Sequence, residues 1–142
     1  MAEAFAVHVS VPLPIDEVWE RLTRWSEAHR WMPGISSLRS EGPTGVGTRL
    51  VFGARGRERE AVISRWVPGR EVAVRSVQGP VTADYRYTCT PGDDRTRVDL
   101  VADVVTNWSA RPLAPVIRLA VRRADRHQLQ SFLAWCAADA RR

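Results

Sequence analysis

The sequence contains no lysine, only two cysteines and no long uninterrupted run of apolar residues. No apolar segment approaches the roughly 20 residues that a transmembrane helix requires, which argues against a membrane-spanning protein. The first five residues lack a basic region followed by an apolar one, so we expect no secretory signal and a cytoplasmic location. Cys89 and Cys136 are far apart and outside any paired motif, which indicates buried thiols and not a disulfide framework.

The motifs of several common catalytic sites are also missing. His8, His29 and His127 have no metal-ligand spacing with one another or with either cysteine, so we expect no metal site. No Gly-x-Ser-x-Gly motif is present, and Gly45-Val46-Gly47 leads into a predicted strand instead of a helix. Nucleophilic hydrolysis and nucleotide binding are therefore disfavoured, and no cofactor is expected.

All 21 basic residues are arginine, and with 16 acidic residues they give a formal net charge of +5. On the predicted strands arginines alternate with acids, as in Arg57-Glu58-Arg59-Glu60, which is typical of exposed paired faces and not of a nucleic-acid site. A separate group lies on the last predicted helix. We interpret it as a solvated face, with a membrane-docking or phosphate-binding patch as a less favoured alternative. Its members are Arg111, Arg118, Arg122, Arg123 and Arg126.

The first third of the chain combines a strand, a proline corner and helical segments. Apolar residues alternate with other residues from Phe5 to Val11, which predicts a strand with one buried face. Pro12 and Pro14 end that strand, and a helix begins at Ile15 with two acidic residues in its first turn. Trp31-Met32-Pro33-Gly34 then ends a second short helical piece.

The middle of the chain predicts six successive strands joined by short turns. Short connections between neighbouring strands favour an antiparallel sheet. Pro68-Gly69 is expected to be the centre of a type II turn, and the alternation just before it is less regular. The predicted strands lie near residues 35–40, 47–52, 59–67, 72–76, 83–89 and 98–104.

The C-terminal segment from about Leu113 to Ala140 predicts one long helix, because it has no glycine or proline after Pro115. Its apolar positions form two faces, which we interpret as a first half facing a hollow and a second half sealing against the sheet. A kink near Arg122 is the alternative. The first face comprises Leu113, Ile117, Ala120 and Ala124, and the second comprises Leu129, Phe132, Leu133 and Cys136.

This order of elements resembles the START-like (SRPBCC) helix-grip superfamily, in its polyketide cyclase/dehydrase-like branch. The most specific residues are Val11-Pro12, Val18-Trp19, Trp31-Met32-Pro33-Gly34 and the Arg65–Arg70 turn. The resemblance covers nearly the whole chain and implies a single domain over residues 1–142. It implies an α+β helix-grip fold: a strand, two short helices, a six-stranded antiparallel meander and a long C-terminal helix across the curved sheet. Members hold hydrophobic or aromatic small molecules, such as lipids or polyketides, in a cavity between sheet and helix.

Alternation places a set of aromatic, apolar and polar side chains on the concave face of such a sheet. The alternative for each of them is plain core packing, or for Arg59 a strand-end position in solvent, and a cavity is favoured for the set. Arg59 shares the parity of Ile63, which favours an inward anchor for a carboxylate, phenolate or enolate. We expect Trp31 and Met32 at the mouth, the four residues of the first helix face on the helix side, and on the sheet Phe52, Arg59, Ile63, Val74, Tyr85, Tyr87, Leu100 and Ala102.

Three functions remain open from the sequence. The first is binding of a hydrophobic small molecule without turnover. The second, taken from the resemblance, is a polyketide cyclase or dehydratase in which Arg59 stabilises an enolate while Tyr85, Tyr87 or His127 exchanges protons. The third is lipid transfer at a membrane surface through the basic helix.

Overall fold

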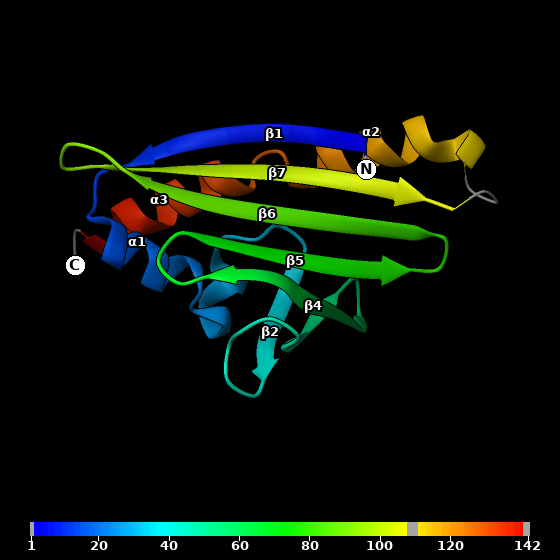
Figure 1. The fold of residues 1–142 in the computed structure, drawn as a ribbon, viewed down its shortest axis with the longest axis horizontal. Coiled ribbons are helices and arrows are strands. Elements are labelled where there is room, and N and C mark those ends of the chain that lie inside the picture. The colour runs from blue at the N-terminus through cyan, green and yellow to red at the C-terminus, as the bar shows by residue number, and fades with distance from the viewer. Residues whose placement is uncertain (1, 108–110, 141–142) are drawn as a thin grey trace.

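The computed structural model describes residues 2–107 and 111–140, and it confirms the α+β helix-grip fold (Figure 1). A strand is followed by two short helices, six further strands and the C-terminal helices. The elements are β1 (Ala2–Val11), α1 (Ile15–Leu22), the 3₁₀ helix η1 (Trp25–Arg30), β2 (Ile35–Glu41), β3 (Arg49–Ala54), β4 (Arg57–Val67), β5 (Glu71–Gln78), β6 (Val81–Pro91), β7 (Thr96–Thr106), the 3₁₀ turn η2 (Arg111–Leu113), α2 (Ala114–Asp125) and α3 (Gln128–Ala140).

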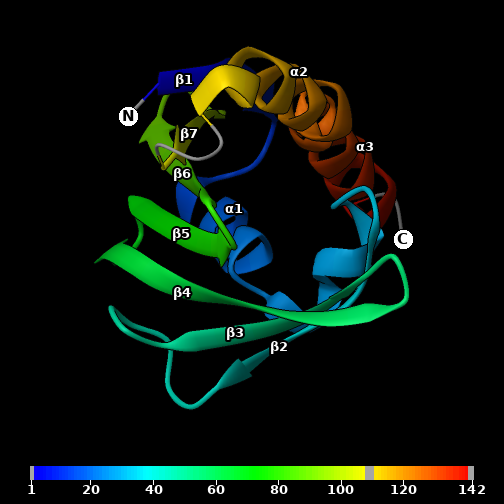
Figure 2. The same ribbon diagram turned by 90° about the vertical axis from the view of Figure 1, so that its right-hand side faces the viewer.

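The strands form one antiparallel sheet in the order β1-β7-β6-β5-β4-β3-β2. Strands β2 to β7 are the predicted meander, and β1 returns to pair with β7. Seen along the long axis of the molecule, the sheet is an arc whose open side is closed by α2 and α3 (Figure 2). This closure leaves one concave face toward the helices and one convex face toward solvent.

The strand register explains which side chains share the concave face. Phe5 lies opposite Ala102 in the β1–β7 pair, and Tyr85 lies between Ala102 on β7 and Val74 on β5. Partners at the same register position point to the same side of a sheet. The less regular alternation in β4 corresponds to a register shift after Ile63, which lets both Ile63 and Trp66 take positions on this face.

The turn between β4 and β5 has the predicted geometry. Gly69 has a φ of 77°, and the Arg70 N–H donates to the Val67 carbonyl oxygen at 2.9 Å. A type II turn needs a positive φ at its third position, which glycine adopts without a steric penalty. The Pro68-Gly69 prediction is confirmed.

Arginines on the convex face pair with acids across strands, as the sequence indicated. Nη1 of Arg49 lies 3.0 Å from Oε1 of Glu60, and Nη2 of Arg75 lies 3.1 Å from Oδ2 of Asp84. Because the Arg49–Glu60 pair is largely solvent-exposed, it contributes at most about 1 kcal/mol to stability. Such pairs neutralise the convex face more than they hold the fold together.

The best-buried part of the core lies where α1, η1 and α3 meet the sheet. The rings of Trp31 and Phe132 are 4.9 Å apart between centroids, and the Trp31 ring meets the Tyr87 ring edge to face at 6.2 Å. Leu22 and Leu129 exclude solvent around them, exposing 1% and 0% of their surfaces. The second predicted helix face, on α3, is thus confirmed as the sealing face.

The C-terminal segment is two helices and not the single helix that we expected from Leu113 to Ala140. α2 ends at Asp125, residues 126–127 form a turn, and α3 begins at Gln128. No glycine or proline causes this break. The alternative of a kink near Arg122 was closer to the observed structure, although the interruption begins four residues beyond Arg122. Within the described ranges, no helix is both long and apolar enough to cross a membrane.

We predict that Phe132→Ala lowers the free energy of unfolding by about 3–5 kcal/mol, because it opens a cavity beside Trp31. Urea denaturation monitored by tryptophan fluorescence measures this change. Leu119→Ala is the matched control, since Leu119 on α2 is 53% exposed and should change stability by less than about 0.5 kcal/mol. Equal destabilisation by both substitutions would contradict this division of the core.

Candidate ligand-binding site

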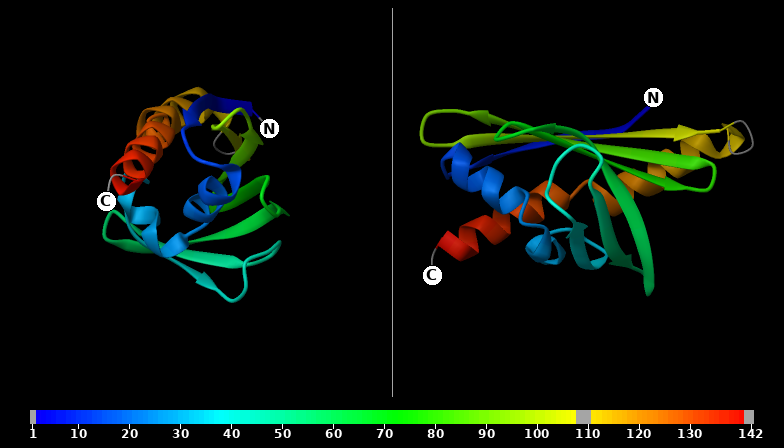
Figure 3. Two further views of the ribbon diagram at one scale, coloured as in Figure 1. Left: turned by 90° about the vertical axis from the view of Figure 1, so that its left-hand side faces the viewer. Right: turned by 60° about the horizontal axis from the view of Figure 1, so that its bottom comes forward.

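The concave face has a buried end under α3 and an accessible end under α2. Along β6, Cys89 and Tyr87 are buried, whereas Tyr85 on the same face is half-buried. On β5, Val72 is buried and Val74 is half-buried. α2 runs over the accessible end but buries none of its own residues (Figure 3). Inward-facing side chains at this end therefore keep contact with solvent.

Two tyrosines on β6 hold the helices through their hydroxyl groups. The Tyr85 hydroxyl donates to Oδ2 of Asp125 at 2.6 Å, and the Tyr87 hydroxyl donates to Oε1 of Gln128. Tyr85 and Tyr87 point to the same face because they are two residues apart on a strand. Asp125 ends α2 and Gln128 begins α3, so the two bonds hold both sides of the helix interruption.

Burial changes the acid–base properties of the Tyr85–Asp125 pair. Burial raises the pKa of the Asp125 carboxyl above its ordinary value, and the hydrogen bond from Tyr85 opposes that rise. Burial also raises the pKa of Tyr85, and the negative charge of Asp125 adds to the rise. The phenol therefore remains protonated at neutral pH, while the carboxyl group is a stronger base than an exposed aspartate.

Burial also raises the pKa of the Cys89 thiol to about 12, so this cysteine is protonated and unreactive at neutral pH. Both cysteines are buried, as the sequence indicated. Cys89 thus contributes apolar surface to the concave face.

Arg59 lies opposite Phe52 in the β3–β4 register, on the concave face and half-buried. Unlike Arg49 and Arg75 on the convex face, it forms no ion pair with any residue that the structure describes. A half-buried guanidinium without a carboxylate partner can bind an anionic or strongly polar oxygen.

Trp31 and Met32 do not lie at a mouth, and this expectation is corrected. They expose 2% and 8% of their surfaces, because the Trp31 ring is enclosed by Phe132 and Tyr87. The indole Nε1 of Trp31 is buried and has no hydrogen-bond partner in residues 2–107 and 111–140. An unpaired buried donor costs about 1–3 kcal/mol.

The other predicted sheet residues lie on the concave face, at different depths. Phe52 and Val74 are half-buried, and the remaining three expose at most 1% of their surfaces. Their contact with a ligand stays a prediction. The three fully buried residues are Ile63, Leu100 and Ala102.

The inner face of α2 is rotated from the face that apolar periodicity indicated. Of the four helix residues predicted to face the hollow, only Ile117 is half-buried, whereas Leu113, Ala120 and Ala124 are exposed. His127 is also exposed. The half-buried positions of α2, which define its inner face, are Ala114, Ile117, Arg118, Val121 and Asp125.

Sequence reasoning missed Asp125 and Gln128. Asp125 is the only acidic residue of α2, among four consecutive polar residues that look like a solvated surface. One available signal was spacing, because Asp125 and Gln128 are three residues apart and such side chains share a helix face. The other was that inward-facing tyrosine hydroxyls need hydrogen-bond partners. In the described part of the chain, no group of three His, Cys, Asp or Glu side chains could hold a metal ion.

An arched antiparallel sheet closed by C-terminal helices defines a helix-grip protein. The chain belongs to the family described as polyketide cyclase/dehydrase and lipid transport, whose model matches residues 3–138. This match confirms the resemblance found in the sequence. No curated protein matches the chain.

Solved structures with the same fold include three enzymes or enzyme domains. The di-domain ARO/CYC StfQ of the steffimycin biosynthetic pathway is 14% identical with a TM-score of 0.74, over 94% of this chain and 49% of that one. The chain thus spans about half of StfQ. The Zhui aromatase/cyclase of a Streptomyces species is 17% identical with a TM-score of 0.72, over 97% and 93% of the two chains. Norcoclaurine synthase of Thalictrum flavum is 15% identical with a TM-score of 0.67, over 96% and 84%. At these identities the likeness establishes the fold.

We predict that Asp125→Asn makes stability less dependent on pH. Since folding raises the pKa of Asp125, the native state binds more protons than the unfolded state above about pH 4, the ordinary aspartate value. The free energy of unfolding of the wild type therefore falls as pH rises through this window, and the variant lacks this fall. Urea unfolding between pH 4 and 7 measures it. Asp93→Asn, on an exposed hairpin, is the control with the same charge change. Parallel pH profiles for wild type and Asp125→Asn would contradict the prediction.

Proposed function

We propose that this protein binds a hydrophobic or aromatic small molecule on the concave face, between α2 and the inner side of strands β3 to β6. The observation that carries this proposal is the partial exposure of Phe52, Val74 and Tyr85, which face inward yet are only half-buried. A helix that only completed a hydrophobic core would bury its own inner residues and the sheet residues that face it. Membership of a family described by polyketide cyclases and lipid transport supports a ligand of this kind.

The polar groups at this end favour a ligand that carries oxygen atoms as well as apolar surface. Arg59 offers an unpaired positive charge beside the Phe52 ring, and Tyr85 and Asp125 offer a donor and an acceptor two strands further along the sheet. A pocket that is mainly apolar, with a few converging polar groups, is the usual form of a small-molecule site. The phenols and ketones of polyketide-like molecules match this pattern.

We predict that wild-type protein binds the neutral aromatic probe 1-aminoanthracene saturably and that Val74→Trp raises its Kd at least about tenfold, because the indole fills the space that the ligand uses. Fluorescence titration measures the affinity. Val62→Trp is the matched control, since Val62 is a neighbouring valine on the convex face with 43% exposure. Normal probe binding by a folded Val74→Trp protein would overturn the site.

A second candidate function is ring closure of a polyketone, and the Tyr85–Asp125 pair favours it. In such an aldol step the Asp125 carboxylate removes a proton from the carbon beside one carbonyl. The enolate carbon then attacks a second carbonyl, whose oxygen takes the Tyr85 proton. Asp125 can return its proton to Tyr85 along their 2.6 Å hydrogen bond, so the pair is regenerated. Arg59, two strands and four residues away from Tyr85 in the register, would bind another oxygen of the substrate.

We predict, for this second function, that Asp125→Asn lowers the rate of ring closure of a synthetic tri-β-ketone thioester by about 10²-fold or more while aminoanthracene binding stays normal. Product formation is followed by liquid chromatography, and Asp93→Asn is the control. Absence of wild-type turnover, or an unchanged rate in Asp125→Asn, removes the enzyme hypothesis. Neither outcome affects the binding proposal, which the probe titration tests separately.

A further inference from the structure

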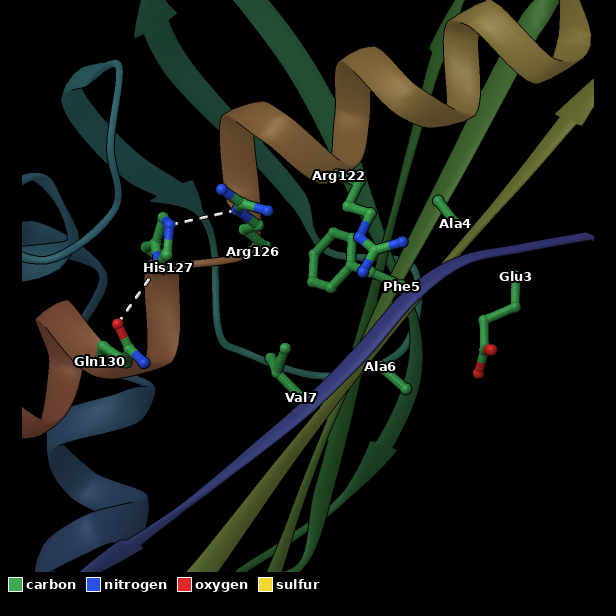
Figure 4. A pocket seen from close by; sticks show the side chains of 9 residues that line it. All are labelled: Glu3, Ala4, Phe5, Ala6, Val7, Arg122, Arg126, His127 and Gln130. Carbon is green, nitrogen blue, oxygen red and sulfur yellow. Dashed lines mark hydrogen bonds between the residues drawn. The ribbon is translucent and has the colours of Figure 1, made fainter.

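A groove of about 420 Å³ lies at the β1 edge of the concave face, between this edge strand and the turn that joins α2 to α3 (Figure 4). Its volume falls within the range of small-molecule sites, about 300–1,000 Å³. The β1 side is largely apolar and includes Phe5 and Val7. The helix side carries Arg122, Arg126 and His127.

The positive charge in this groove is not neutralised by its surroundings. In the ranges that the structure describes, Arg122 and Arg126 form no ion pair. The one acid of α2, Asp125, is turned inward to the Tyr85 hydroxyl. Glu3 is the one acid among the lining residues, and its side chain points away from Arg122 in Figure 4. The helix rim is therefore positive over an apolar floor.

A short hydrogen-bonded chain orients Arg126. Its Nε–H donates to Nε2 of His127 at 3.1 Å. Since guanidinium is always a donor, Nε2 accepts, and the Nδ1–H of His127 donates to Oε1 of Gln130 at 3.2 Å. This chain occupies Nε of Arg126 and leaves its two terminal amino groups for another acceptor.

Arg122 and Arg126 are placed to act on one anion. The Arg126 N–H donates to the Arg122 carbonyl oxygen at 2.9 Å, so the two residues are still related by one helical turn. Side chains one turn apart lie on the same side of a helix. Two guanidinium forks side by side match the several acceptor oxygens of a carboxylate or phosphate.

We propose that this groove binds a single-chain anionic amphiphile, whose carboxylate or phosphate pairs with Arg122 and Arg126 while its alkyl chain lies along Phe5 and Val7. The groove lies at the β1 edge of the arch, apart from the site proposed against β3 to β6, and does not depend on the function proposed there. Charge complementarity selects the headgroup, and the apolar surface of β1 selects the chain. Free amphiphile, and not a membrane surface, is the expected source, because the apolar floor is a strand enclosed on one side by helices.

The test compares three probes with the same alkyl chain: dodecanoate, dodecyl phosphate and dodecanol. Affinities are measured by isothermal titration calorimetry for wild type, Arg122→Gln, Arg126→Gln and the double variant. Arg123→Gln is the matched control, because Arg123 is the adjacent exposed arginine, carries the same charge and does not line the groove. Amide shifts of residues 4–7 in nuclear magnetic resonance spectra report where the probes bind.

We expect both anionic probes to shift the amides of residues 4–7 and to lose about tenfold or more in affinity in the double variant, with no change in Arg123→Gln. Dodecanol should bind more weakly and equally to all variants. Equal losses in Arg123→Gln would indicate a diffuse charge effect and overturn the proposal. The proposal is also overturned if dodecanol binds as tightly as the anionic probes, or if inorganic phosphate binds as tightly as dodecyl phosphate. Binding to phosphatidylglycerol vesicles without binding of free dodecanoate would overturn it as well.

Normal 1-aminoanthracene binding by the double variant separates the two sites. The proposal fails if loss of Arg122 and Arg126 abolishes neutral-probe binding in the concave face to the same extent, because the groove would then be part of that site. Failure of the concave site alone, seen with Val74→Trp, leaves the amphiphile titrations unaffected.

Discussion

The hydrogen bonds from the Tyr85 and Tyr87 hydroxyl groups on β6 fix the positions of α2 and α3 over the sheet. Tyr85 holds Asp125 and Tyr87 holds Gln128, so one strand fixes both sides of the turn between α2 and α3. These groups are largely buried, and each lost bond would leave a polar atom without a partner at a cost of about 1–3 kcal/mol. The bonds therefore determine how close the helices come to the sheet, and with it the space between them.

The same interruption assigns different tasks to the two helices. α3 inserts Leu129 and Phe132 into the core and closes one end of the arch. α2 covers the other end without burying a residue, and it directs Asp125 inward and two arginines, Arg122 and Arg123, outward. A straight continuous helix could present only one inner stripe along its length. The turn lets the chain seal one end of the arch and cover the other with a second stripe.

Much of this architecture could be predicted from the sequence, because the strands alternate strictly and short turns leave few alternatives for the sheet. Proline and glycine marked the corner after β1 and the turn at Gly69. No glycine or proline marks the interruption after Asp125. The bonds that accompany it come from tyrosines about forty residues earlier in the chain, so the local sequence did not indicate it. Trp31 was placed at a mouth because its partner Phe132 is a hundred residues away in the chain. The inner face of α2 was misassigned because alanine and valine occur all around that helix, so apolar periodicity could not identify it.

The absence of buried residues on α2 has a consequence for how this protein can change over generations. Most substitutions are harmful because they lower folding stability, and a site built from core residues can adapt only within the limits of packing. Here the inner stripe of α2 faces the accessible end of the arch, while cohesion of the molecule rests on α3 and the opposite end. Residues such as Ile117 can therefore vary in size and polarity with little effect on folding, which leaves ligand preference open to selection while the scaffold stays intact.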